Sequence, residues 1–169
     1  MEIKLEKYEI DLGTFVGNKR YEEAILQNKK DSYGFKKSPE ESRQIHIDGA
    51  IGEVAFAKAM NWFYSGSVNT YKNGGDVGAI QVRTRSKHSY DLIVRNNDRD
   101  NDIFVLVTGC LSDKYIIHGW IIAKDAKNQK FSKNYGDRPS AYFVTKEYLR
   151  SIKSLYKSVM LKDFKTKFE

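Results

Sequence analysis

The feature that most constrains the fold is a segment with a well-marked helix start and an apolar middle. Ser38 can cap a helix, Pro39 suits its first position, and Glu41 is placed to bond back to the cap. Residues 49–57 are then small or apolar on nearly every side of such a helix, apart from one acid. We therefore predict a helix from about Pro39 to Met60 that is buried all round over residues 49–57.

Glu53 is the single charged side chain in that apolar run. An isolated ionised carboxylate in apolar surroundings is costly, so it must pair with a cation, bind a metal or stay protonated with a raised pKa. His46, Ala50 and Ala57 share its helical face, and the small alanines leave room for another group to approach. Pairing with an arginine of a packed helix and ligation of a metal are both open at this point.

A second acid, Asp76, lies in a glycine-flanked segment that leads into a strand. Gly75 and Gly78 allow a sharp turn around it. The residues that follow alternate in character, with Ile80, Val82 and Thr84 on one side and Gln81, Arg83 and Arg85 on the other. This period of two predicts a strand over about residues 79–85 with one polar face. Asp76 and Gln81 are an odd number of residues apart, so they converge only if the glycines bend the chain.

The remaining pattern predicts a single domain over residues 1–169. Continuous apolar runs at residues 103–108 and 115–123 are typical of strands covered on both faces. The other expected elements are strands over 2–10, 91–95 and 141–145, a helix over 18–27, a turn at 86–89 that returns the chain, a polar hairpin turn at 96–102, a surface loop over 124–139, and a closing amphipathic helix that carries Leu149, Ile152, Leu155, Tyr156 and Val159. Together they indicate an α/β fold with a central mixed, mostly antiparallel sheet flanked by helices.

Charge and composition narrow the classes of partner. The net charge of +7 favours a polyanion such as nucleic acid, although a lysine-rich surface also serves solubility. No run of eighteen apolar residues and no signal-peptide pattern occurs, so we expect no membrane partner and a cytoplasmic location. The single cysteine, Cys110, fits a reducing compartment and cannot form a thiolate zinc cage.

Other chemical motifs are weak. Asp98, Asp100 and Asp102 have the spacing of the first calcium-loop ligands, but Ile103 and Gly109 stand where that loop needs glycine and glutamate. The three histidines lack metal-ligand spacing, and neither a phosphate-binding glycine loop nor a nucleophile elbow is present.

The helix acid Glu53, the turn acid Asp76 and the triplet Gln81-Val82-Arg83 resemble the core of the PD-(D/E)xK, or restriction-endonuclease-like, nuclease superfamily, and more loosely its small phage-encoded members. The resemblance spans roughly residues 47–144. It implies a metal-dependent nuclease that acts on DNA, in the infected host cytoplasm if phage-encoded, with Mg²⁺ or Mn²⁺ held by Glu53, Asp76 and Gln81. It also implies that Arg83 belongs to the catalytic set and that Arg83, Arg85 and Lys87 contact the nucleic acid.

Two positions depart from the family pattern. Gln81 is neutral, so it can ligate a metal only through its amide oxygen, and Arg83 stays protonated, so it can hold a phosphate but cannot act as a general base. Lys87 and His88 could replace the missing lysine only if the turn folds back toward the site. The alternative is a catalytically degenerate nuclease-fold protein that binds nucleic acid or a protein partner without cleavage. DNA or RNA, endo- or exonuclease action and a homodimer are left open.

Overall fold

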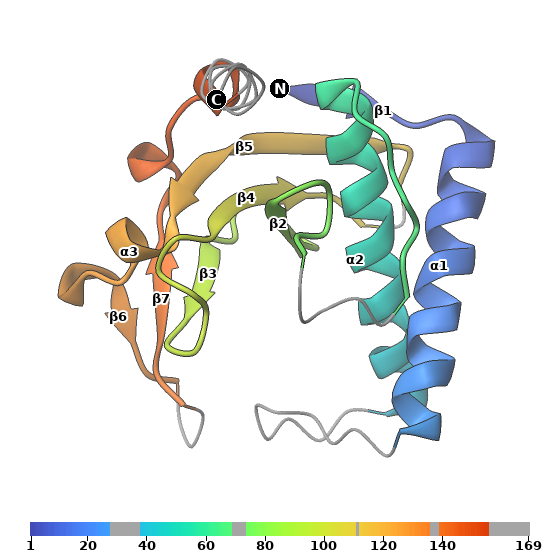
Figure 1. Cartoon of the computed structure of the whole chain (residues 1–169), viewed down its shortest axis with the longest axis horizontal. Helices are drawn as coiled ribbons and strands as arrows, with labels where there is room; N and C mark the ends of the chain where they lie inside the picture. The colour runs from blue at the N-terminus through green and yellow to red at the C-terminus, as the bar shows by residue number, and fades with distance from the viewer. Residues whose placement is uncertain (28–37, 69–73, 111, 136–138, 156–169) are drawn as a thin grey trace, which may run out of the picture.

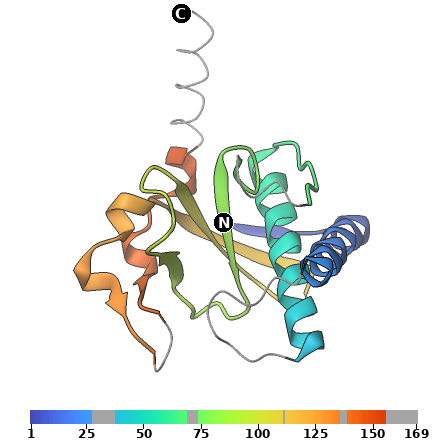
Figure 2. The same cartoon turned by 60° about the horizontal axis from the view of Figure 1, so that its bottom comes forward.

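The computed structural model describes residues 1–27, 38–68, 74–110, 112–135 and 139–155. Two long helices, α1 (Lys7–Leu26) and α2 (Pro39–Met60), lie side by side (Figure 1). Helix α2 packs against one face of a four-stranded sheet, and α1 packs on α2. The view in Figure 2 shows the same helix pair on one side of the molecule and the smaller strands on the other.

The strands form two sheets. The four-stranded sheet has the order β1 (Glu2–Lys4), β5 (Lys114–Ile122), β4 (Ile103–Thr108), β2 (Ile80–Arg85), and only its β2–β4 pair is parallel. The three-stranded sheet is antiparallel, in the order β3 (Leu92–Arg95), β7 (Ala141–Val144), β6 (Ser132–Lys133). The expected α/β class, with a mixed, mostly antiparallel sheet flanked by helices, is confirmed. The expectation of one central sheet is wrong, because β3, β6 and β7 form a second sheet.

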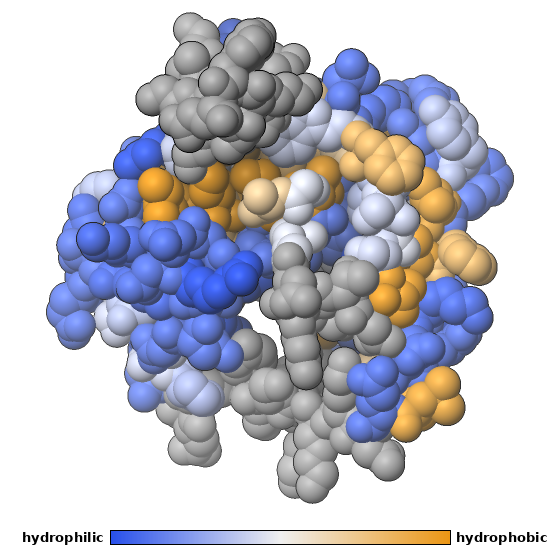
Figure 3. All heavy atoms as spheres, in the orientation of Figure 1, coloured by the Kyte–Doolittle hydropathy of each residue, from blue (hydrophilic) through white to orange (hydrophobic). Residues whose placement is uncertain are grey.

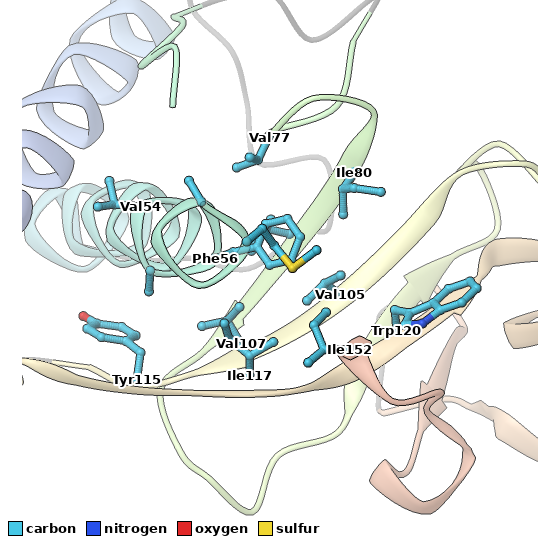
Figure 4. Packing of buried hydrophobic residues seen from close by; sticks show 14 of the residues in the cluster. Val54, Phe56, Val77, Ile80, Val105, Val107, Tyr115, Ile117, Trp120 and Ile152 are labelled. Atoms are coloured by element: carbon cyan, nitrogen blue, oxygen red, sulfur yellow. The ribbon is translucent and has the colours of Figure 1, made fainter. Parts of the chain in front are cut away.

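Helix α2 has the predicted bounds because its ends are marked in the sequence. The Ser38 hydroxyl accepts a hydrogen bond from the Glu41 amide at 3.1 Å, and the Glu41 carboxylate accepts one from the Ser38 amide at 2.9 Å. Asn61, with a φ of 53°, adopts the left-handed conformation that ends the helix. Phe56 is fully buried, and Figure 4 shows how it packs between α2 and the sheet.

Helix α1 begins eleven residues earlier than predicted, at Lys7 rather than at residue 18, so the expected strand over 2–10 is right only for Glu2–Lys4. The early part of this helix has no apolar periodicity in the sequence, because Gly13 and Gly17 form the face that meets α2. A Cβ at Gly17 would collide with the backbone of Ile47, so the two helices touch almost backbone to backbone. Tyr8, Leu12 and Phe15 instead point outward and are exposed. Figure 3 shows apolar side chains scattered among polar ones over the helices. Because glycines form the buried face of α1 and apolar side chains lie on its exposed face, the sequence does not show the apolar stripe that usually marks an amphipathic helix.

Two apolar cores lie on opposite faces of the four-stranded sheet. The first core lies between α2 and the sheet and includes Val54, Phe56, Val82, Val105, Val107 and Ile117 (Figure 4). The second core lies between the two sheets and includes Leu92, Val94, Phe104, Leu106, Ile121 and Phe131. Strand β4 contributes alternate residues to both cores, which confirms that it is covered on both faces.

Several connections differ from the expected ones. The turn after β2 and the segment 96–102 after β3 each lead into a strand of the other sheet, so neither closes a hairpin. The expected loop over 124–139 contains α3 (Ala123–Ala126), the 3₁₀ turn Gln129–Phe131 and β6, because Ala126 and Phe131 are drawn into the second core. A further 3₁₀ turn, Lys146–Tyr148, precedes the chain end.

The closing helix is described only at residues 152–155. Ile152 and Leu155 pack into the first core, as the spacing predicted. Leu149 and Arg150 precede the helix, and Arg150 forms a β-bridge with Trp120. Tyr156 and Val159 lie outside the described residues.

Candidate functional site

Glu53 is buried, with 4% of its surface exposed, and it is paired with an arginine of α1. Arg20 donates from both terminal nitrogens, Nη1 to Oε1 at 2.5 Å and Nη2 to Oε2 at 2.8 Å. The Tyr64 hydroxyl donates to Oε2 at 3.1 Å. Arg20 also donates to the Ser67 carbonyl from Nε and Nη2, at 3.2 and 3.0 Å, which fixes the guanidinium plane. Of the two alternatives left open by the sequence, the structure shows the pairing with an arginine.

Asp76 lies in a tight turn that folds back onto the beginning of β2. Its backbone amide donates to the Ile80 carbonyl at 2.8 Å, and Val77 and Ile80 form an isolated bridge. Gly78, with a φ of 59°, supplies the left-handed residue that this turn needs. The Asp76 Oδ2 then accepts a hydrogen bond from the Val82 amide at 2.6 Å. The glycines therefore bend the chain, as the odd spacing required.

The two acids are close enough to affect each other. Burial raises the pKa of Glu53 to about 7, against the hydrogen bonds from Arg20 and Tyr64, and the charge of Asp76 raises it further. Burial also raises the pKa of Asp76, while the Val82 amide and the charges of Arg83 and Arg20 lower it. Both carboxyl groups are thus easier to protonate than in water, which a nearby cation would reverse.

Gln81 and Arg83 project from the face of β2 that is turned away from α2. Ile80 and Val82 belong to the first core, whereas the Arg83 guanidinium lies 4.6 Å above the ring of Phe104, in the second core. Arg83 also forms an ion pair with Asp98, at 3.1 Å from Nη2 to Oδ1. The Gln81 amide nitrogen reaches the Gly74 carbonyl at 3.5 Å, which places it beside the Asp76 turn.

Arg85 and Lys87 lie at the far end of β2. The Arg85 guanidinium lies 4.8 Å above the Tyr90 ring, and the Lys87 ammonium is 5.6 Å from the same ring. His88 is exposed, and its Nδ1 lies 2.8 Å from the Thr108 hydroxyl. In the structure, the turn after β2 leads into the second sheet. Of the predicted site residues, Asp76 lies near enough to Glu53 for its charge to act on Glu53, and Gln81 lies beside the turn of Asp76. Arg85 and Lys87 lie at the other end of β2.

The oxygen donors here suit a hard cation. Asp76 Oδ1 accepts no hydrogen bond from the residues that the structure describes, and neither does the Gln81 amide oxygen. Glu53 could contribute only in exchange for contacts with Arg20. Two acids with a neutral oxygen fit Mg²⁺ or Mn²⁺ better than zinc. No cluster of three or more histidine, cysteine or acidic side chains suited to a metal occurs in the described residues.

Sequence reasoning missed Arg20 and Tyr64. A signal for Arg20 exists, because Gly13, Gly17 and Arg20 follow the i, i+4, i+7 spacing of one helical face. Since the glycines mark the face of the helix that packs on its neighbour, a basic residue on the same face is predicted to contact that neighbouring helix. Tyr64 follows α2 within a loop, and no periodic pattern marks it.

No protein-family model matches this chain, and neither a curated protein nor a solved structure shows significant similarity to it. Among the described residues, no helix has both the length and the apolar content needed to cross a membrane.

Proposed function

We propose that the chain is a metal-dependent nuclease with a restriction-endonuclease-like fold, acting on the phosphodiester bonds of DNA. The observation that carries the proposal is that Asp76, in the turn before β2, lies near enough to Glu53 of α2 for its charge to raise the pKa of Glu53. Arg20 already pairs with Glu53, so a metal ion would chiefly compensate the charge of Asp76, whose Oδ1 accepts no hydrogen bond from the described residues.

Asp76, Gln81 and Glu53 are the residues that would hold Mg²⁺ or Mn²⁺. Such an ion makes water nucleophilic at neutral pH and offsets the charge that develops on a phosphodiester. Asp76 is the main ligand in this proposal, since one of its oxygens is held by the Val82 amide while the other is free of hydrogen bonds from the described residues. The Val82 bond orients the carboxylate. Arg20 would keep Glu53 in place and share its charge.

Positive charge for the substrate comes from β2. The Arg83 guanidinium is held by Asp98 and the Phe104 ring, so it is oriented rather than free to swing. Its charge lowers the pKa of Asp76, although burial raises that pKa more strongly. Arg83 would therefore stabilise a phosphate electrostatically, without serving as a base.

A second candidate function is nucleic-acid binding without cleavage. It is favoured by the bidentate Arg20–Glu53 pair, which fills both oxygens of one proposed ligand, and by the neutral Gln81. A homodimer also stays a prediction.

The test is a cleavage assay with labelled single- and double-stranded DNA in Mg²⁺ or Mn²⁺. Asp76→Asn keeps an oxygen for the Val82 amide but removes the charge, and we expect it to lower the cleavage rate by about a hundredfold or more. Asp11→Asn on α1, which changes an exposed acid, is the matched control. Absence of metal-dependent cleavage, or equal cleavage by Asp76→Asn, would refute the nuclease.

Metal binding is measured separately by thermal unfolding. We expect Mg²⁺ to raise the Tm of the wild-type protein and of Asp11→Asn, because a ligand that binds the folded state stabilises it. The Tm of Asp76→Asn should not respond. If Mg²⁺ leaves the wild-type Tm unchanged while the protein binds DNA in a salt-sensitive way, the second candidate function is favoured.

A further inference from the structure

The outer face of the three-stranded sheet carries aromatic and basic side chains. Leu92 and Val94 point into the second core, so Ile93 and Arg95 project from the other face of β3. The register places Phe143 opposite Ile93 on that face. Arg95 and Lys133 are both paired with Ala141, so Lys133 shares the face as well.

Two aromatic rings on this face contact each other and a lysine. Tyr135 meets Phe143 edge to face, with ring centroids 5.0 Å apart, and 56% of the Tyr135 surface is exposed. The Lys133 ammonium is 5.9 Å from the centroid of the Phe143 ring. An edge-to-face pair uses one face of one ring only, so ring surface remains for a further stacking partner.

The end of β2 lies next to β3 and adds a third ring and more positive charge beside this face. Arg85 stacks on Tyr90, which is 36% exposed. Arg85 has no acidic group within 4 Å among the described residues, and burial together with the charge of Arg95 lowers its pKa, while Tyr90 and Asp91 act in the opposite direction. A half-buried guanidinium near a second one is stabilised by an added anion. Asp91 is paired with Lys133, at 3.8 Å.

We propose that this aromatic–basic surface, formed by Arg85, Tyr90, Arg95, Lys133, Tyr135 and Phe143, binds single-stranded nucleic acid. The rings stack on unpaired bases, and the guanidinium and ammonium groups contact the phosphates between them. A duplex offers the same phosphates but keeps its base faces hidden in the stack, so it cannot use the rings. The net charge of +7 is complementary to such a partner.

The surface also fits the position of the proposed active site, and this step rests on the proposed function. Arg85 ends the strand that Ile80 begins, directly after the turn of Asp76. Five residue steps along a strand span about 17 Å, a distance that a few nucleotides can bridge. A strand held at Tyr90 and Tyr135 would extend along β2 toward Glu53 and Asp76. Binding itself does not depend on that chemistry.

The experiment measures binding by fluorescence anisotropy of the full chain in EDTA, so that cleavage cannot occur. The probes are labelled oligo-dT, oligo-U and a DNA duplex of equal length, each at several salt concentrations. We expect tighter binding of a single strand than of the duplex. Tyr135→Ala and Tyr90→Ala should each weaken single-strand binding by about tenfold, as expected when a base-stacking ring is removed. The plot of log affinity against log salt concentration has a negative slope, and Arg85→Gln should make it shallower by about 0.7.

Matched controls lie on α1, away from this surface. Tyr8→Ala removes an exposed ring and Lys19→Gln removes an exposed charge, and neither should change the affinity by more than about twofold. Equal affinity for duplex and single strand, or ring variants that bind as Tyr8→Ala does, would overturn the inference. Binding of oligo-dT or of oligo-U supports the inference, and the ratio of the two affinities shows which of these two probes is preferred. Tight single-strand binding in EDTA, together with no cleavage in Mg²⁺, would refute the proposed nuclease function but support the proposed binding surface.

Discussion

Replacing Glu53 by glutamine should change how stability depends on pH. The folded-state pKa of Glu53 is raised from its ordinary value of 4.5 to about 7, chiefly by burial. Above about pH 4.5 the unfolded chain loses this proton while the folded protein keeps it, so the folded state becomes less stable as the pH rises toward 7. Glutamine has no proton to lose, so this contribution disappears in Glu53→Gln.

The pKa difference sets the size of the effect. A rise from 4.5 to about 7 corresponds to about 3 kcal/mol of unfolding free energy, fully present below about pH 4.5 and lost once the pH has passed about 7. Glu53 is only 4% exposed, so solvent screening reduces this little. With a typical urea dependence, about 3 kcal/mol shifts the unfolding midpoint by on the order of 1–3 M.

The assay is urea unfolding between about pH 5 and pH 8, comparing wild-type protein, Glu53→Gln and Glu40→Gln. Glu40 is an exposed acid near the start of the same helix, so its replacement should leave the wild-type pH dependence unchanged. The wild-type protein should lose stability relative to Glu53→Gln as the pH rises. A stability difference between wild-type protein and Glu53→Gln that stays constant from about pH 5 to pH 8 would refute the reasoning, because it would mean that Arg20 outweighs burial and keeps the carboxylate ionised throughout.

Two further predictions concern the helices. Gly17→Ala should destabilise the protein by about 1–3 kcal/mol in urea unfolding, because its methyl group meets the Ile47 backbone, whereas Gly49→Ala, with open space around it, should stabilise α2 by up to about 1 kcal/mol. Equal effects of the two would contradict the close helix contact. Ser38→Ala should cost about 1 kcal/mol in the same measurement through loss of the bond to the Glu41 amide, and an unchanged midpoint would mean that the cap contributes nothing.

Local signals were enough to predict α2 and the alternation of β2. Ser38, Pro39 and Glu41 act within one helical turn, and their effect does not depend on the rest of the fold. The apolar and polar positions of β2 follow from its backbone geometry alone. Both predictions therefore hold whatever the strand or helix packs against.

Local signals of this kind could not predict which distant segments pair with each other. Strand β2 is parallel to β4, and the strand that follows it in sequence joins another sheet, which no period-two pattern can specify. Helix α1 was seen only in part, because its buried face is built from glycines. The partner of Glu53 was also missed. Arg20 lies 33 residues away in sequence, and its contact with Glu53 exists only once α1 and α2 have packed.

The hydrogen bond from the Val82 amide to Asp76 also occupies a backbone donor at the edge of the four-stranded sheet. Strand β2 ends its sheet, and an edge strand with unpaired amides can recruit a strand from another molecule. The carboxylate occupies one such amide, and the turn from Gly75 to Gly78 covers the Ile80 carbonyl beside it. We therefore expect that removing the Asp76 side chain entirely would leave the Val82 amide unpaired and favour pairing of β2 with a strand of another molecule.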